Sequence, residues 1–298
     1  MKKFEGMGVA MVTPFKADGS VDFKSLEKIT NHIIEGGCNY LVVMGTTSEA
    51  VTLNTQEKNA VTSYIKEINN GRIPVVLGVG GNSTQQVIDN IREADFEGID
   101  GILSVAPYYN KPGQKGIMLH FKEIAMACPV PIILYNVPGR TSCNISSETC
   151  LELAWSFNNI AGVKEASGDL EQVMEIIAGK PEGFDVISGD DLLTLPIIAL
   201  GGSGVISVLG NAFTAEWSEM VSLALKSKNK KAREIHYKYK ELIKLLFIDG
   251  NPAGVKSALS SLGMCNNSLR LPLTGVSRST SNSINTIIEK LRLKETVV

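Results

Sequence analysis

Short runs of apolar residues recur along the chain about every 25 to 35 positions. Each run is about five residues long and shows little alternation between apolar and polar side chains. This pattern is typical of strands that are buried on both faces of a parallel sheet. The predicted strands are Gly8–Val12, Tyr40–Met44, Val75–Val79, Gly101–Val105, Ile132–Tyr135, Ile160–Lys164, Val186–Ser188 and Gly204–Val208.

Segments with helical patterns separate these strands. The first runs from Asp22 to Ile34, with an acidic cap at its start and two glycines after its end. Further helices are predicted to begin at Thr55, Ser83, Ser146 and Thr214. Eight strand–helix units in succession predict an α/β fold, a (β/α)8 TIM barrel with right-handed crossovers. A doubly wound open sheet is the alternative, but the Gly-rich turn typical after its first strand is replaced by Thr13-Pro14-Phe15.

The strand pattern stops near residue 226. We therefore assign residues 1–225 to the barrel and residues 226–298 to a C-terminal helical region that packs on it. Helices are predicted over Ala232–Phe247 and Ser281–Leu293, and Pro252 opens another between them. Since too few residues remain for a core of their own, this region is expected to be an appendage of the barrel.

Composition narrows the class of protein. The net charge of −2 over 298 residues favours neither nucleic acid nor an anionic membrane as a partner. The most apolar stretch, residues 192–209, is interrupted by proline and glycine and is too broken to span a bilayer. The first residues lack the apolar segment of a signal peptide. Five scattered cysteines and three scattered histidines predict reduced thiols in a cytoplasmic protein, without a metal site.

Lys164 is the leading candidate for chemistry. It follows four residues of strand character, so it lies at the carboxyl end of the sixth strand, where barrel enzymes place their active sites. A neutral lysine amine in apolar surroundings can attack a carbonyl carbon. Taken alone, the segment is equally compatible with a solvated lysine on a strand-to-helix loop.

Other strand ends carry polar residues that converge on the same face. Thr46 and Thr47 follow the second strand, and their hydroxyls and backbone N–H groups are suited to bind a carboxylate or pass a proton. The alternative is an ordinary turn before a capped helix. Tyr108 and Tyr109 follow the fourth strand in a loop stiffened by prolines, which is also compatible with a packing role.

The fifth strand ends in Tyr135, which can act as an acid and a base. Arg140, five residues later in a loop stiffened by Pro138, can bind a carboxylate through two hydrogen bonds, or it forms a structural ion pair. The glycines between residues 201 and 204 favour close backbone packing over phosphate binding, because no basic residue accompanies them. Together with Lys164, these residues fit imine chemistry on a 2-keto acid.

Five motifs resemble those of the dihydrodipicolinate synthase family, within the lysine-dependent class I aldolases that include N-acetylneuraminate lyase. They are Gly45-Thr-Thr-Ser-Glu49, Pro107-Tyr-Tyr-Asn110, Tyr135-Asn-Val-Pro-Gly-Arg-Thr141, Gly162-Val-Lys-Glu-Ala166 and Ser188-Gly-Asp-Asp191. The resemblance runs from about Gly8 to the last helices. It implies a lyase of lysine biosynthesis by the diaminopimelate route, which condenses pyruvate with L-aspartate 4-semialdehyde in a cytoplasmic homotetramer, without a cofactor.

The resemblance also implies roles for individual residues. Lys164 is expected to form the Schiff base with pyruvate. Tyr135, Thr46 and Tyr109 are expected to form a proton relay, with Tyr109 reaching into a neighbouring subunit's site. The residues expected to bind substrate are Thr47 for pyruvate, Arg140 for the carboxylate of the semialdehyde, and the backbone near Gly189 and Ile206 for the rest of the pocket.

Two alternatives remain. The first is another Schiff-base aldolase or lyase that acts on a 2-keto acid, similar to N-acetylneuraminate lyase; Arg140 speaks against it, because those lyases typically lack this arginine. The second is a catalytically inactive barrel with a binding or regulatory role. The joint presence of Thr46, Tyr109, Tyr135 and Lys164 with Arg140 argues against that reading.

The sequence departs from the family pattern at two places. Ser48 replaces the glycine usual in the threonine loop, and a serine with positive φ is expected to strain that loop. At the positions where lysine binds in feedback-inhibited relatives, the chain has Thr55, Lys58, Asn82, Gln86 and Tyr108. Since Lys58 adds a cation and Gln86 lacks the usual acid, weak or absent inhibition by L-lysine is expected.

Overall fold

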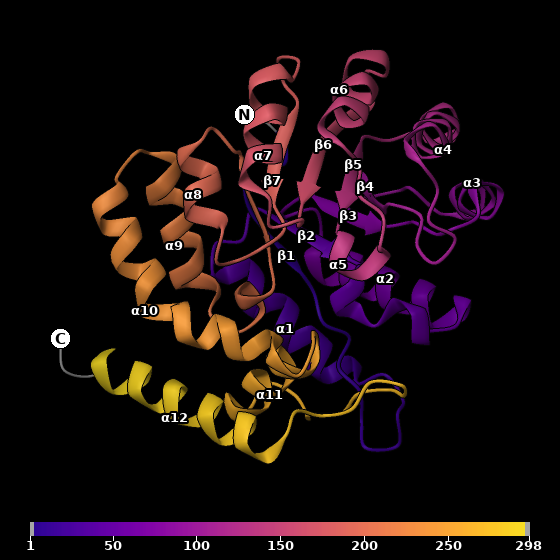
Figure 1. Ribbon diagram of the computed structural model, residues 1–298. Coiled ribbons are helices and arrows are strands. Elements are labelled where there is room, and N and C mark those ends of the chain that lie inside the picture. The colour runs from indigo at the N-terminus through magenta and orange to yellow at the C-terminus, as the bar shows by residue number, and fades with distance from the viewer. Residues whose placement is uncertain (1–2, 296–298) are drawn as a thin grey trace.

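Eight parallel strands close into a barrel that is surrounded by helices in the computed structural model, which describes residues 3–295 (Figure 1). Each strand pairs with the next, and the last pairs with the first. The strands are β1 (Gly6–Ala10), β2 (Tyr40–Val43), β3 (Val75–Gly78), β4 (Gly101–Val105), β5 (Ile132–Asn136), β6 (Ile160–Glu165), β7 (Asp185–Ser188) and β8 (Gly204–Ser207). The predicted TIM barrel is therefore confirmed.

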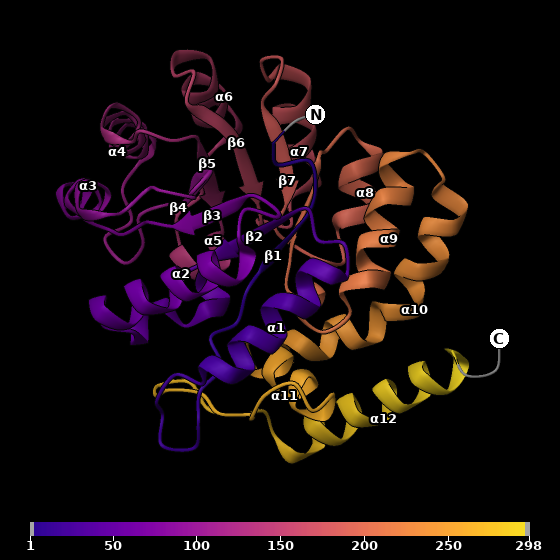
Figure 2. The ribbon, with the colours of Figure 1, turned by 180° about the vertical axis from the view of Figure 1, so that it is seen from behind.

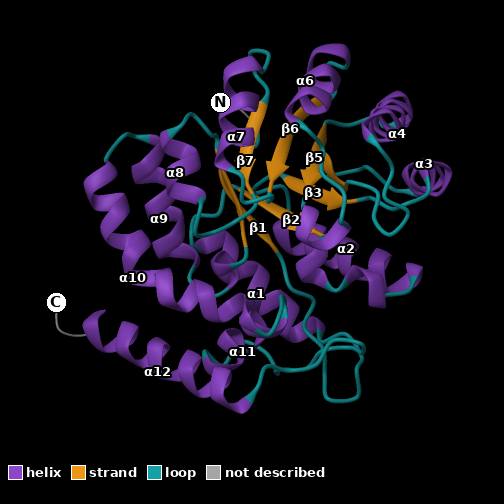
Figure 3. Cartoon of the chain, in the orientation of Figure 1, coloured by secondary structure: helices purple, strands orange, loops and turns teal. Residues whose placement is uncertain are grey.

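The helices form the outer layer around the strands, as Figure 3 shows. Those that follow the strands are α1 (Phe23–Glu35), α2 (Thr55–Asn69), α3 (Thr84–Glu93), α4 (Gln114–Ala127), α5 (Pro138–Thr141), α6 (Ser147–Ser156), α7 (Leu170–Gly179), α8 (Thr194–Ala199) and α9 (Thr214–Leu225). Several begin where the sequence predicts. Asp22, Ser83 and Ser146 each accept a hydrogen bond from a backbone N–H in the first turn of the helix that follows.

Two local predictions are wrong. The strand β1 begins at Gly6 rather than Gly8, because Gly6 pairs with Gly204 where β1 meets β8. A Cβ atom on Gly204 would overlap the carbonyl oxygen of Gly6, so the glycine cluster serves close backbone packing. The segment after β5 was expected to be a loop, but α5 forms one helical turn there with Pro138 at its first position.

Side chains from alternate strand positions fill the barrel interior. Val42, Ile133, Ile187 and Ile206 belong to this inner cluster, and Tyr135 extends it to the carboxyl end of β5. The intervening strand residues pack against the helices in two larger clusters. The interior is therefore a packed core rather than a pore, and the strand ends form its accessible face.

Three helices follow the barrel: α10 (Asn229–Ile248), α11 (Ala253–Ser261) and α12 (Arg278–Glu295). Figure 2 shows them beside α1 and α9, at the opposite side of the barrel from α3 and α4. Trp217 of α9, Tyr239 of α10, Leu259 of α11 and Ile288 of α12 are buried in one shared cluster. The predicted C-terminal helices thus belong to the same outer cluster as the helices and strand faces of the barrel.

Two other properties bear on the sequence-based expectations. All five cysteines are free thiols. Among residues 3–295, no helix combines the length and the apolar character that crossing a membrane requires.

Candidate active site

Lys164 and Tyr135 lie directly opposite each other on the neighbouring strands β6 and β5. Both side chains are buried, and that of Lys164 is only 5% exposed. The Lys164 Nζ atom lies 4.3 Å from the centroid of the Tyr135 ring. The carboxyl ends of two strands therefore bring an amine and a phenol together, as the sequence predicts.

Two lysines are buried among the described residues, and their surroundings differ. Lys256 of α11 pairs with the carboxylate of Glu49 at 2.5 Å. Lys164 has no carboxylate partner among residues 3–295. Because Lys164 is buried, its interpretation as a solvated loop lysine is wrong. Buried lysines are rarely left without a partner, which makes Lys164 unusual. Its amine is held in an apolar site without a structural ion pair.

Hydrogen bonds on the outer side of the sheet fix the two strand ends. Asn136 and Glu165, the residues after Tyr135 and Lys164, also lie opposite each other. The Asn136 side-chain amide donates to a Glu165 carboxylate oxygen at 3.0 Å and accepts from the N–H of Ile145 at 2.9 Å. Gln172 donates to the same carboxylate at 2.9 Å. These residues were not predicted from the sequence, although polar side chains at the ends of apolar strands are a usable signal.

The loop after β2 begins with a 3-10 turn over Thr46–Ser48, and a second 3-10 turn follows over Ala50–Thr52. Thr46 is exposed and Thr47 is buried. The left-handed residues of this loop are Met44, with φ 56°, and Glu49, with φ 54°. Ser48 lies outside that region, and its hydroxyl donates to the carbonyl of Met11 at 2.8 Å. The expected strain at Ser48 is therefore wrong, because the strained positions are its neighbours.

Arg140 lies in the helical turn α5, just beyond the end of β5. Its side chain is exposed, and its guanidinium forms no ion pair with any residue that the structure describes. The alternative of a structural ion pair is therefore wrong. The guanidinium remains available to an incoming carboxylate.

The remaining predicted pocket residues belong to the ends of β7 and β8. The N–H of Gly189 donates to the carbonyl of Glu165 at 2.7 Å, which ties the loop after β7 to the end of β6. Ile206 is buried in the inner cluster. Asp191 accepts hydrogen bonds from the N–H groups of Val208 and Leu209. Burial raises the pKa of the Asp191 carboxyl, and these donors oppose the rise.

Among the predicted site residues, Tyr109 is highly exposed. It has φ 73° and is 88% exposed, in the loop after β4. Tyr108 beside it is also exposed. A tyrosine in the left-handed region is uncommon, and so large an exposed aromatic surface leaves Tyr109 free to contact another molecule.

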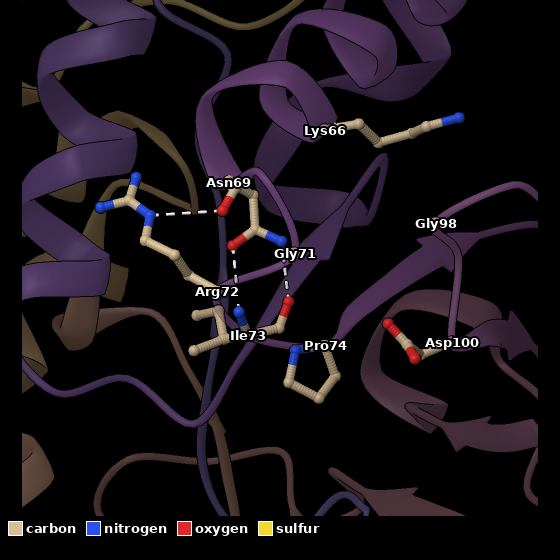
Figure 4. Close-up of a pocket in the computed structure, with 8 residues that line it drawn as sticks. All are labelled: Lys66, Asn69, Gly71, Arg72, Ile73, Pro74, Gly98 and Asp100. Atoms are coloured by element: carbon tan, nitrogen blue, oxygen red, sulfur yellow. Dashed lines mark hydrogen bonds between the residues drawn. The ribbon is translucent and has the colours of Figure 1, made fainter.

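A hollow of about 330 Å³ lies elsewhere, at the amino ends of β3 and β4 (Figure 4). Its wall is a turn in which the Asn69 side chain donates to the carbonyl of Ile73 and accepts from its N–H. The Asn69 amide and the Ile73 backbone satisfy each other's hydrogen bonds, so neither is free to bind a ligand in this hollow. Across the described residues, no cluster of three or more His, Cys, Asp or Glu side chains is suited to hold a metal ion.

Comparison with known proteins places this site in a family. Residues 3–291 match the model of the dihydrodipicolinate synthetase family. The chain is 51% identical to 4-hydroxy-tetrahydrodipicolinate synthase from Flavobacterium psychrophilum, over 98% of this chain and 99% of the relative. It is 42% identical to the crystal structure of dihydrodipicolinate synthase from Aquifex aeolicus, with a TM-score of 0.94 over 97% of this chain and 99% of that one.

The synthase from Cyanidioschyzon merolae, solved with lysine bound, is 39% identical with a TM-score of 0.93, over 97% of this chain and 98% of that chain. These relatives cover nearly the whole chain, including the strand ends that carry Tyr135 and Lys164. The chain therefore belongs to the dihydrodipicolinate synthetase family.

Proposed function

We propose that this protein condenses pyruvate with L-aspartate 4-semialdehyde, as a 4-hydroxy-tetrahydrodipicolinate synthase in the diaminopimelate route of lysine biosynthesis. The observation that carries the proposal is the buried Lys164 amine, which faces Tyr135 and has no carboxylate partner in the described chain. Two relatives that are 51% identical to this chain carry the name of this enzyme, which supports the choice of substrates.

The chemistry begins at the Lys164 nitrogen. The neutral amine attacks the keto carbon of pyruvate, and the hydroxyl of the adduct leaves as water with a proton from Tyr135. Loss of a proton from the methyl group of the imine gives an enamine, whose carbon adds to the aldehyde. The amino group of the second substrate then attacks the imine carbon, which closes the ring and releases Lys164.

The threonine loop is proposed to handle the carboxylate and the protons. Thr47 binds the pyruvate carboxylate, and Thr46 with Tyr109 extends the proton path from Tyr135. The high exposure of Tyr109 supports a role in which it reaches the site of a neighbouring subunit. We therefore propose a homotetramer, a dimer of dimers, working in the cytoplasm.

Arg140 is proposed to select the second substrate through its carboxylate, with the backbone at Gly189 and Ile206 lining the rest of the pocket. Arg140→Ala should raise KM for aspartate semialdehyde far more than KM for pyruvate, because a charge-assisted contact is lost only with that substrate. Steady-state kinetics with each substrate varied will measure this. Equal increases in both KM values would point to a structural role.

A coupled assay with pyruvate and aspartate semialdehyde tests the reaction, and cleavage of N-acetylneuraminate is the control for the alternative lyase. Borohydride reduction in the presence of pyruvate should add the reduced adduct to Lys164, as read by mass spectrometry of peptides. Lys164→Ala should abolish this trapping. Trapping at the wild-type level in that variant would refute the nucleophile assignment, and no trapping in the wild type would favour an inactive barrel.

A further inference from the structure

Buried polar contacts join the loop after β2 to the C-terminal helical region. Glu49 and Lys256 are both 0% exposed, and their charged atoms lie 2.5 Å apart. The second carboxylate oxygen of Glu49 accepts from the N–H of Arg270 at 3.0 Å. Two residues before Glu49 in the same loop, the hydroxyl of Thr47 accepts a hydrogen bond from the side-chain amide of Asn251 at 2.9 Å. The segment from Asn251 to Arg270 therefore holds this loop at two points.

Stability alone does not explain such a pair. Removing two charges from water is unfavourable, and well-packed apolar residues in their place are often as stable. Burial lowers the pKa of the Lys256 ammonium, although Glu49 opposes this effect. The ammonium also lies 4.1 Å from the centroid of the Phe15 ring, which partly compensates for lost water. Buried ion pairs are best understood where they select one conformation among several.

The loop that the pair holds has an unfavourable backbone. Glu49 itself adopts a left-handed conformation with φ 54°, and Met44 at the other end of the loop has φ 56°. Residues other than glycine keep such angles only where the surrounding structure imposes them. Between them lies the turn Thr46–Ser48, which carries the two threonines at the strand end. The ion pair thus acts directly on the residue whose conformation sets the end of this turn.

We propose that Lys256 and Glu49 are positioning residues for pyruvate binding. Their ion pair holds Glu49 in the left-handed conformation, and this presents Thr47 to the substrate carboxylate. The inference rests on the proposed role of Thr47 in binding pyruvate. It assigns the C-terminal region a part in the active site, although Lys256 acts through Glu49 and not on the substrate.

Lys256→Met tests the inference, because methionine approximates the length of lysine and removes the ion-pair partner of the Glu49 carboxylate. We expect KM for pyruvate, and the pyruvate concentration for half-maximal borohydride trapping, to rise about tenfold or more. KM for aspartate semialdehyde should change by less than about twofold, since Arg140 lies in the helical turn α5 and not in the loop that the pair holds.

Glu49→Gln provides a second, nearly isosteric test if the methionine variant fails to fold. It should raise KM for pyruvate as well. The double variant Glu49→Gln/Lys256→Met should be no worse for pyruvate than the worse single variant, because the two residues act as one unit. Additive losses would show that they act separately and would overturn the pair as the positioning device.

Two control variants separate positioning from loss of stability. Ile288→Val trims the core of α12 without touching the pair, so it should lower Tm but leave the pyruvate titration unchanged. Lys244→Met removes an exposed cation from α10 and should change neither. If Lys256→Met lowers Tm yet leaves half-maximal trapping within about twofold of wild type, the pair is merely structural and the inference is wrong.

Thr47→Val, measured in parallel, shows which proposal fails. An unchanged pyruvate titration in Thr47→Val would remove the proposed role of Thr47, and the positioning inference with it. A raised KM for pyruvate in Thr47→Val, combined with a normal KM in Lys256→Met and Glu49→Gln, would keep the role of Thr47 and overturn only the inference about the ion pair.

Discussion

Tyr135 and Lys164 owe their contact to the register of two strands, which places them on directly opposed positions at the barrel mouth. Since the phenol lies beside the amine, it is suited to protonate the oxygen that leaves when the imine forms. Tyr135→Phe keeps the ring and removes only the hydroxyl. It should lower kcat by about 10²- to 10⁴-fold, as measured in the coupled assay. A change confined to KM would make Tyr135 a binding residue.

Sequence patterns predicted Lys164 but not Lys256, and the reason is physical. Lys164 ends an apolar strand, so its position in the fold follows from local sequence. Lys256 lies in a short helix, and its partner Glu49 is 207 residues away in the chain. No local pattern distinguishes it from a solvated lysine. The prediction of strain at Ser48 was wrong for a similar reason. The backbone angles of this turn depend on contacts with Met11 and with the C-terminal region, which are distant in the sequence.

At the scale of elements, we predict that the contact between α3 and α4 is less stable at low pH. The His120 ring of α4 is buried, and its Nδ1 atom lies 2.9 Å from the Thr84 hydroxyl of α3. Burial lowers the pKa of His120 from 6.5 to about 4. Between these values the unfolded chain binds a proton that the folded chain does not. The stability contribution is therefore complete above pH 6.5 and is lost as the pH falls towards 4.

His120→Gln removes the titrating ring and retains a hydrogen-bonding side chain. Relative to this variant, the wild type should lose of the order of 2–3 kcal/mol of unfolding free energy between pH 6.5 and 4. Urea denaturation at several pH values will measure the difference. A difference that does not change with pH would show that His120 is not responsible for acid sensitivity.

The hydrophobic pattern and the capping residues were sufficient to predict the strands and most helices. They were not sufficient to predict where β1 begins or that α5 forms. All eight strands lie where apolar runs occur, because a parallel barrel buries both faces of each strand. The start of β1 is set by its pairing with Gly204, which lies at the far end of the barrel sequence. The turn α5 depends on hydrogen bonds from Arg140 and Thr141 to Val137, which a pattern dominated by proline and glycine does not reveal.

For the whole molecule, an exposed Tyr109 predicts that activity requires assembly. If Tyr109 acts in a neighbouring subunit, Tyr109→Phe and Lys164→Ala chains should complement each other. Random mixing after refolding should restore about one quarter of wild-type activity, because half of the dimers are hybrids and each hybrid has one intact site. Activity that stays at the level of the separate variants would place Tyr109 outside the relay.

The surface near the paired tyrosines predicts weak feedback by L-lysine. Lys58 places a cation on α2, and the Gln86 amide, which bonds to Asn90, offers no anion to a cationic ligand. Loss of one charge-assisted contact costs about 1.5–3 kcal/mol, or roughly 10- to 150-fold in affinity. Half-inhibition should therefore require more than millimolar lysine in the coupled assay.

The variant Lys58→His/Gln86→Glu serves as the matched control for this prediction. It removes the fixed cation and restores an acid, so it should be inhibited at lower lysine concentrations than the wild type. Sub-millimolar half-inhibition of the unmodified enzyme would contradict the prediction.

The separation of Glu49 and Lys256 along the chain also has a consequence for the protein during its synthesis. At about 5–20 residues per second, the 207 residues between them take roughly 10–40 s to translate. The threonine loop leaves the ribosome early, and for that interval the carboxylate that will later anchor it remains in water. A nascent chain can thus assemble several strand–helix units before its threonine loop is anchored, so a ribosome-bound chain that stops before α11 should bind pyruvate more weakly than the finished protein.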